Sequence, residues 1–490
     1  CEWGDQRRRV LRAQSTTHWR LIPAGRRSRS ARFPASTFEE ELQVAEGQTI
    51  CVIGGGASGI SAASMAKRSN PDAHVICCTE FEDVAYSPCG VPYVLGKEIP
   101  EFERLFLAGP EQYVASGVDL RRETKVTAAN ATDRTITAGG ETIKWDRLIV
   151  CSGFNYTLPQ IPGTDLDGVT YVKNIRRGVQ LNERLNGVKK AVVLESTPLG
   201  VEMLTAFAHR GIETHLVDPG SWLLSMVADP DIAEPVQKSL EELGCTLHFG
   251  TEATAFLGSG GKLRAVQTSA GEIEADICIV ATHKEPETTL ARQLGLTLGS
   301  TGGIVVDSSM RTSVDGVFAA GDCVEVPQGM TNVAVQGLTG AHAMQQGRVA
   351  GANAGGGKRT YNAVYVPWGM VGGEMQIGGA SFGEHLATAA GIPHIVCTAT
   401  GVSRARYYPG AQLITVKLLA EPGTGKLIGA QMVGGEGIKE RADFLAFAMK
   451  KGSTLEDIAW MENVYSPPIG ALYEPMSTAA QNGLAMLSGA

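Results

Sequence analysis

The sequence predicts an α/β protein in which two doubly wound β-α-β domains precede a smaller α+β domain. Three observations support this fold class. A short apolar strand, a glycine-rich turn and a helix follow one another at 49–68, and the same alternation returns at 190–218. After a glycine-rich linker at 356–358, strands and a helix mix without that alternation. The length of 490 residues also fits three domains of about 150 residues each.

The first β-α-β unit carries the signature of a dinucleotide-binding turn. A β-branched strand over 49–53 leads into a G-x-G-x-x-G turn, a helix is expected over 60–68, and Glu80 ends the next strand. The motif glycines are Gly54, Gly56 and Gly59. Glycines here let the backbone approach a pyrophosphate at the helix N-terminus, and the acid accepts a hydrogen bond from a ribose. The complete setting therefore predicts a bound dinucleotide.

Two later strands are expected to end beside the same ligand. One covers 145–150 and runs into small residues at Gly153, and the other runs into Gly321 and Asp322. Ligands of parallel α/β sheets lie at the carboxyl ends of the strands. A helix expected over 340–353 directs its N-terminus into the same crevice.

The second β-α-β unit repeats this plan with an altered turn. Glu195 and Thr197 stand where the first two glycines belong. Gly200 keeps the third place, a helix is expected over 200–210, and Asp218 ends the following strand. A Cβ at a close-approach glycine blocks the backbone, and a carboxylate repels a pyrophosphate. At roughly 1–3 kcal/mol for each effect, dinucleotide binding in this unit is expected to be weak.

Cys89 is the candidate reactive thiol. It lies in a Ser-Pro-Cys-Gly turn just before an expected helix over 91–96. A helix N-terminus favours the thiolate and lowers the pKa of a thiol. Other cysteines are interpreted as core because they lie in apolar strands: Cys51, Cys151 and Cys278. The sequence has no C-x-x-C or H-x-x-x-H spacing, so no metal site is predicted.

Residues 48–482 together resemble the pyridine nucleotide–disulfide oxidoreductases. The resemblance is narrower to the single-cysteine branch, which contains coenzyme A-disulfide reductases, NADH oxidases and peroxidases, and NAD(P)H sulfur or persulfide reductases. The motifs that carry it are GGGASG with Glu80, SPCGVPY around Cys89, Gly321-Asp322, YYPG from Tyr407 and YSPP from Tyr465.

This resemblance implies a domain plan and a cofactor. The implied FAD-binding domain is split between 46–160 and 286–357, and an NAD(P)-type domain covers 161–285. Residues 358–490 form the implied dimerisation domain of a homodimer. The resemblance therefore predicts a flavoprotein of the cytoplasm, with NAD(P)H as the family's usual electron donor.

The same resemblance assigns roles to individual residues. Cys89 matches the redox thiol beside the flavin, and Tyr407 and Tyr465 match tyrosines that reach the active site of the partner subunit. Lys67 and Arg68 match a basic pair that meets a phosphate of coenzyme A. The implied activity is FAD-dependent reduction of a disulfide or persulfide through the thiol, with coenzyme A disulfide as the favoured substrate.

Three departures from the family pattern narrow this activity. Ala57 stands where oxidases and peroxidases carry a histidine, which disfavours oxygen or peroxide as the main substrate. Glu195 and Thr197 put the use of NAD(P)H in doubt, as does His283 in place of an expected glycine. The alternative function is therefore a flavoprotein subunit or redox sensor that takes electrons from a protein partner.

Charge separates an N-terminal arm from the rest of the chain. Residues 1–32 hold nine Arg and two acids, which gives +7 and leaves −15 for the remainder of a chain whose total is −8. Residues 1–45 are interpreted as a leader or upstream artefact, with a transit peptide for organelle import or a basic tail as alternatives. The acidic body argues against nucleic-acid and anionic-membrane binding. The sequence contains no uninterrupted apolar run of 18 residues, so no membrane-spanning helix is predicted.

Overall fold

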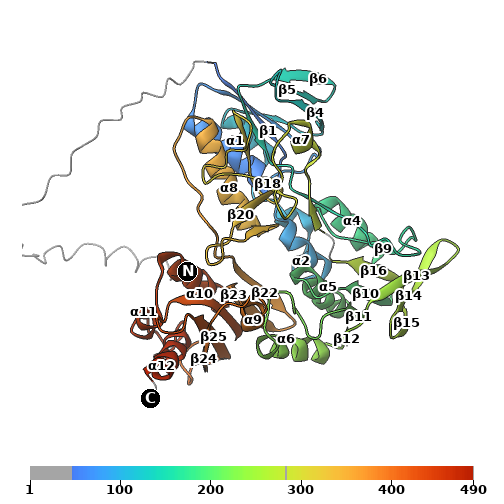
Figure 1. The fold of residues 1–490 in the computed structure, drawn as a ribbon. Helices are drawn as coiled ribbons and strands as arrows, with labels where there is room; N and C mark the ends of the chain where they lie inside the picture. The colour runs from blue at the N-terminus through green and yellow to red at the C-terminus, as the bar shows by residue number, and fades with distance from the viewer. Residues whose placement is uncertain (1–46, 282–283, 489–490) are drawn as a thin grey trace, which may run out of the picture. The chain divides into compact units, whose positions relative to one another are not determined.

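The computed structural model describes residues 47–281 and 284–488 (Figure 1). The predicted arm at 1–45 and the prediction for His283 lie outside the described residues. Within the described part of the chain, no helix is long and apolar enough to cross a membrane. The same residues contain no group of three or more His, Cys, Asp or Glu side chains arranged to hold a metal ion.

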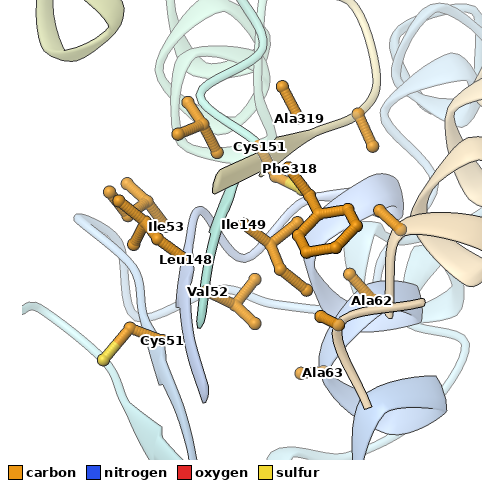
Figure 2. Packing of buried hydrophobic residues seen from close by; sticks show 14 of the residues in the cluster. Cys51, Val52, Ile53, Ala62, Ala63, Leu148, Ile149, Cys151, Phe318 and Ala319 are labelled. Atoms are coloured by element: carbon orange, nitrogen blue, oxygen red, sulfur yellow. The ribbon is translucent and has the colours of Figure 1, made fainter. Parts of the chain in front are cut away.

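The first β-α-β region is built on a five-stranded parallel sheet with the order β19-β7-β1-β2-β3. Its strands are β1 (Thr49–Ile53), β2 (His74–Cys78), β3 (Val118–Arg121), β7 (Arg147–Val150) and β19 (Val317–Ala319). Most of the β-branched and apolar residues of these strands are buried, as expected for a parallel sheet covered by helices. Figure 2 shows Val52, Ile149 and Phe318 gathered beside Ala62 and Ala63.

Further elements complete this region around the sheet. Its helices are α1 (Ala57–Ser69), η1 (Pro88–Gly90), α2 (Val91–Leu95), η2 (Phe102–Leu105), α3 (Pro110–Ala115), α7 (Thr289–Gln293) and α8 (Gly340–Ala354). Its smaller strands are β4 (Val126–Asn130), β5 (Thr135–Ala138), β6 (Glu141–Lys144), β8 (Phe154–Tyr156), β17 (Lys284–Pro286), β18 (Ile304–Val305), β20 (Val324–Pro327) and β21 (Ala334–Gln336). Buried residues of α1, α7, α8 and β20 share one core with the sheet, whereas those of α2 and η2 belong to the core of the second β-α-β region.

Helices α1 and α8 pack in parallel with very close backbones (Figure 1). A Cβ on Gly347 would lie 2.1 Å from the Ser58 carbonyl oxygen, and one on Gly351 would lie 2.1 Å from that of Ala62. One residue of α1 precedes the contact at Ser58, and seven residues of α8 precede the contact at Gly347, a difference of six residues. At 1.5 Å per residue, the N-terminus of α8 extends about 9 Å beyond that of α1.

The second β-α-β region repeats the first in topology. Its parallel sheet has the order β12-β11-β10-β16-β9. The strands are β9 (Val169–Thr170), β10 (Lys190–Leu194), β11 (Glu213–Asp218), β12 (Thr246–Phe249), β13 (Ala253–Ser259), β14 (Lys262–Thr268), β15 (Gly271–Glu274) and β16 (Ile277–Val280). The helices are α4 (Ile175–Arg184), α5 (Pro198–His209) and α6 (Pro230–Glu242). Each region also carries a three-stranded antiparallel sheet, β4-β5-β6 or β13-β14-β15.

The C-terminal region is α+β, with an antiparallel sheet of order β22-β23-β26-β25-β24. Its strands are β22 (Pro367–Gly372), β23 (Met375–Ser381), β24 (Ile395–Val402), β25 (Leu413–Ala420) and β26 (Leu427–Gly434). Its helices are α9 (Glu384–Ala389), α10 (Ile438–Lys451), α11 (Leu455–Ala459) and α12 (Pro475–Ser488). The three regions together confirm the predicted fold class.

Two expected helix starts were placed too late. Helix α1 begins at Ala57 rather than at residue 60, because the second half of the glycine motif forms its first turn. Helix α5 begins at Pro198, because proline at the first helical position has a suitable φ and needs no hydrogen-bond partner for an N–H. The cysteines interpreted as core are buried, as predicted: Cys51, Cys151 and Cys278.

Candidate active site

The residues expected to meet a dinucleotide share one edge of the first sheet. β1, β2, β7 and β19 are parallel. Gly54, Glu80, Gly153 and Asp322 all follow the carboxyl end of one of these strands. The Glu80 carboxylate lies 3.0 Å from the ammonium of Lys125. The topology therefore brings these sequence-predicted residues to the edge where ligands of such sheets bind.

The three motif positions of the first turn are glycine for different physical reasons. A Cβ on Gly54 would lie 2.2 Å from the Cys151 carbonyl oxygen, and the residue has a φ of +110°. A Cβ on Gly59 would lie 1.8 Å from the carbonyl oxygen of Gly54. A Cβ on Gly56, by contrast, would meet nothing within 4 Å. The protein's own packing thus requires Gly54 and Gly59, whereas Gly56 keeps open space over the turn.

Two helix N-termini give this edge the properties of an anion site. Helix α1 starts after Gly56 with no side-chain cap and no acid in its first turn. Helix α8 starts after Thr339 in the same way, and a Cβ on Gly340 would meet nothing within 4 Å. Open N–H groups at a helix start attract phosphate through hydrogen bonds and the helix dipole. These residues fit the diphosphate of a dinucleotide such as FAD.

The second turn has the same backbone path with a different chemistry. Glu195 has a φ of +68°, the left-handed region that its counterpart Gly54 also occupies. A Cβ on Gly200 would lie 2.2 Å from the Glu195 carbonyl oxygen, which repeats the contact of Gly59. The third glycine is therefore retained for packing in both units. The first two positions carry side chains instead.

Hydrogen bonds within this second turn cap the start of α5, whereas the start of α1 in the first turn has no side-chain cap. The Thr197 hydroxyl accepts a hydrogen bond from the Gly200 N–H at 3.2 Å and donates one to the Ala281 carbonyl oxygen at 3.0 Å. Pro198, the first residue of α5, has no N–H to offer. The start of α5 is therefore largely capped by the protein itself.

Asp218 lies where the sequence predicts it, at the end of β11, but it supports the turn from inside. Its carboxylate accepts hydrogen bonds from the N–H groups of Ser196 at 2.5 Å and Gly220 at 2.6 Å. The residue is buried. Asp218 therefore serves the local backbone in this structure.

Cys89 departs from the sequence-based expectation about its acidity. It lies in the short turn η1, and the helix that follows, α2, has only five residues. Cys89 has solvent-accessible surface. Surrounding protein nevertheless desolvates the thiol and raises its pKa, and the charges of Glu202 and Asp322 raise the pKa further. Lys284 acts in the opposite direction. Desolvation and two carboxylates therefore outweigh the helix terminus that the sequence suggested.

Lys284, Glu202 and Tyr93 are residues of this site that the sequence analysis missed. The Lys284 ammonium lies 2.6 Å from the Asp322 carboxylate and 4.0 Å from the centre of the Phe154 ring, a cation–π distance. The Tyr93 hydroxyl donates a hydrogen bond to the Glu202 carboxylate at 3.2 Å. A lone glutamate inside the apolar stretch of α5 was the available signal for Glu202.

The remaining predicted residues lie away from the sheet edge. The hydroxyls of Tyr407 and Tyr465 lie 2.8 Å apart, and both side chains are exposed. Lys67 donates hydrogen bonds to the carbonyl oxygens of Pro71 at 2.7 Å and Ala73 at 2.8 Å, which anchors the end of α1. Arg68 is exposed. Of the basic pair, Arg68 is thus the member that we retain as a candidate phosphate ligand.

The fold and the site define a dinucleotide-dependent oxidoreductase with an exposed thiol. The chain belongs to the pyridine nucleotide-disulphide oxidoreductases: the family model matches residues 48–347, and the model of its dimerisation domain matches residues 371–474. Members of this family use FAD and NAD(P)H. The family assignment and the fold confirm what the sequence motifs predicted.

Relatives cover nearly the whole body of the chain. A protein of Methanocaldococcus jannaschii named NADH oxidase is 33% identical over 89% of this chain and 99% of its own length. A Pyrococcus furiosus protein named NAD(P)H sulfur oxidoreductase (CoA-dependent) is 30% identical over 89% and 99%. The structure of an NAD-dependent persulfide reductase from A. fulgidus has a TM-score of 0.87 and 29% identity, and the match covers 90% of this chain and 84% of that one.

Proposed function

We propose that this chain is an FAD-dependent enzyme that reduces a disulfide or persulfide through Cys89. One observation carries the proposal: of the nine cysteines in the part of the chain that the structure describes, Cys89 is the only exposed one. Its electrostatic neighbours include Lys284 and Asp322, at the sheet edge that fits a dinucleotide. A substrate and a cofactor thus have access to the same sulfur.

The proposed chemistry is thiol–disulfide exchange. The Cys89 thiolate attacks one sulfur of the substrate, the substrate S–S bond breaks, and a mixed disulfide forms while one thiolate leaves. The leaving thiolate takes a proton from the hydroxyl of Tyr465, which is hydrogen-bonded to Tyr407. Lys284 favours the attacking thiolate by its positive charge. FAD, when bound and already reduced by the electron donor, would supply the electron pair that, together with two protons, converts the mixed disulfide to two thiol groups.

Coenzyme A disulfide is the substrate that we favour, followed by coenzyme A persulfide or polysulfide. The P. furiosus relative is named as CoA-dependent, which supports this choice. Residues 33–490 carry −15, so the protein as a whole does not attract an anionic substrate. Recognition of its phosphates then depends on local cations, for which exposed Arg68 is the candidate.

We also propose that the enzyme acts as a homodimer through its C-terminal region, with the site residues Tyr407 and Tyr465 contributed to the partner subunit. The family's dimerisation domain matches this region. Exposed apolar side chains gather in the same part of the sequence: Phe447, Trp460, Val464, Ile469, Leu472 and Tyr473. Such side chains are expected to be covered in the working assembly.

A second proposal concerns the electron donor. The family uses NAD(P)H, yet Thr197 and Pro198 leave the start of α5 with few open donors, and Glu195 places a carboxylate at the turn. These features support weak NAD(P)H binding and a protein partner as the main donor. Under this alternative the chain is the flavoprotein subunit of a larger electron-transfer system.

An anaerobic titration of the flavin absorbance tests both proposals. We expect a disulfide of coenzyme A to restore the colour of the reduced flavin in the wild type, and Cys89→Ser to lose this reoxidation while retaining bound flavin. Full disulfide turnover in Cys89→Ser contradicts the thiol mechanism. Rapid bleaching at micromolar NADH or NADPH contradicts the proposed weak donor site.

A further inference from the structure

A hydrogen bond ties the thiol-bearing segment to the second β-α-β region. Tyr93 lies on α2, four residues after Cys89, and its hydroxyl donates to Glu202 of α5 at 3.2 Å. The two helices pack with close backbones, because a Cβ on Gly96 would lie 3.1 Å from the Cα of Ala206. This packing fixes the Glu202 carboxyl beside the segment that carries the thiol.

The Glu202 side chain is half-buried, and its environment differs from that of an ordinary surface carboxylate. Burial raises the pKa of Glu202 to about 7, although the hydrogen bond from Tyr93 opposes that rise. A carboxyl with such a pKa changes charge over small changes of pH. The charge also matters to Cys89, because Glu202 is the largest electrostatic contribution that raises the pKa of the thiol.

A cavity lies beside this carboxyl and is lined by residues of α2, α5, β22 and β23. It has a volume of about 190 Å³, enough for several water molecules. The lining residues include Tyr93, Glu98, Glu202, His209, Glu374 and Gln376. At its rim, His209 Nδ1 lies 3.4 Å from the Glu98 carboxylate, and both side chains are partly exposed. The cavity therefore offers a polar route between Glu202 and solvent.

The charges around the thiol are not equivalent. Asp322 is paired with Lys284 at 2.6 Å, so much of its field is balanced by a cation. The hydrogen-bond partner that the described residues give Glu202 is the neutral hydroxyl of Tyr93. Tyr156 also faces this group of charges, and burial first and then the Asp322 charge raise its pKa to about 12, so it stays neutral. Glu202 is thus the anion whose charge can vary near neutral pH.

We propose that Glu202 is a positioning residue for Cys89: its carboxyl exchanges protons with water in the cavity, and its charge sets the fraction of the thiol that is ionised. When the thiol loses its proton to solvent, Glu202 takes one up from the cavity, so the two groups share one negative charge. This inference deepens the proposed function, since it concerns the sulfur that we propose to attack the substrate. Under this proposal, the cavity is the path by which protons pass between Glu202 and solvent.

The pH dependence of Cys89 alkylation by iodoacetamide tests this coupling in the full-length, flavin-loaded protein. Glu202→Gln removes the variable charge, so we expect the apparent pKa of alkylation to fall by about one unit. Tyr93→Phe removes the hydrogen bond that favours the carboxylate, so Glu202 becomes neutral over a wider range. We expect a smaller fall in the same direction. Glu98→Gln, which changes the rim of the same cavity, is the matched control and is expected to leave the apparent pKa unchanged.

An unchanged or raised alkylation pKa in Glu202→Gln overturns the proposal, as does an equal fall in Glu98→Gln. Flavin absorbance and the unfolding midpoint report whether each variant is folded. If Glu202→Gln does not fold, the Tyr93→Phe variant provides the test. An unchanged or raised apparent pKa of alkylation in Tyr93→Phe also overturns the inference. Alkylation reports on the thiol without turnover, so a fall in pKa in a chain that reduces no disulfide would refute only the proposed function.

Discussion

Glu195 adopts the left-handed backbone of the residue that it matches in the first unit, Gly54. The φ angles are +68° and +110°, and each residue directly follows the first strand of its β-α-β region. Glycine reaches this conformation without steric cost, whereas a residue with a Cβ pays roughly 1–2 kcal/mol. The second turn therefore has the same shape as the first turn, but without the glycine that favours this shape.

This strain leads to a prediction about stability. Glu195→Gly relieves the Cβ contact, so we expect a gain in the free energy of unfolding of about 1 kcal/mol, measured by thermal or denaturant unfolding. Glu123→Gly is a matched control, because Glu123 is exposed and also has a left-handed φ, of +50°. Relief of backbone strain alone should therefore give a similar gain in this variant. A loss of stability in Glu195→Gly would show that the side chain contributes more than the backbone strain costs.

The same turn predicts how NAD(P)H binding responds to restored glycines. The double variant Glu195→Gly with Thr197→Gly removes the carboxylate and the cap on the Gly200 N–H. Two effects of roughly 1–3 kcal/mol each correspond to at least a tenfold lower concentration of NADH or NADPH for half-bleaching of the flavin. The Glu123→Gly variant is expected to match the wild type in this titration. An unchanged half-bleaching concentration in the double variant would contradict the proposed block.

The sequence predicts those elements of the fold that are determined by residues close together in the chain. The strand at Thr49–Ile53 was expected with the bounds observed, because a β-branched run between polar and glycine residues has few alternatives. The start of α1 was missed, because Gly59 is tolerated inside the helix for a reason visible only in three dimensions. Its position is set by contact with the Gly54 carbonyl oxygen.

The site was harder to predict, because its electrostatics come from distant segments. Tyr93 and Glu202 lie 109 positions apart in the sequence and meet only through the packing of α2 on α5. Lys284 reaches Asp322 across 38 positions. The expected low pKa of Cys89 came from the helix that follows it, and the sequence contained no measure of the desolvation that reverses it.

The tyrosine pair leads to a prediction about turnover. If Tyr465 protonates the leaving thiolate, Tyr465→Phe should lower kcat for disulfide reduction by about 10²-fold or more, with the dimer intact in sedimentation. Tyr407→Phe removes only the hydrogen bond to Tyr465 at 2.8 Å and should have a smaller effect. Tyr408→Phe is the control, since Tyr408 is an exposed neighbour that we assign no role. Equal rates in all three variants would rule out the proposed acid.

A buried lysine links the C-terminal sheet to the second β-α-β region. The Lys417 ammonium of β25 lies 3.1 Å from Asp229, 2.9 Å from Asp231 and 2.6 Å from Glu384. Lys417 and Asp229 have side-chain exposures of 4% and 1%. Burial alone would raise the pKa of Asp229, but hydrogen bonds from His385 and Glu384 and the charge of Lys417 outweigh it and lower the pKa.

This cluster predicts both a stability loss and its pH dependence. Lys417→Met leaves the Asp229 carboxylate buried without its cation, so we expect a loss of about 3–5 kcal/mol in the free energy of unfolding. Because folding lowers the pKa of Asp229, its stabilising contribution is present above the unfolded value near 4 and disappears as the pH falls through the folded value. Lys417→Met should therefore lose part of the acid sensitivity of the wild type in unfolding midpoints measured from pH 3 to 7. Lys439→Met, which breaks an exposed ion pair with Asp443, is the control and should not change the midpoint. Parallel pH profiles for Lys417→Met and the wild type would show that Lys417 does not hold the pKa of Asp229 down.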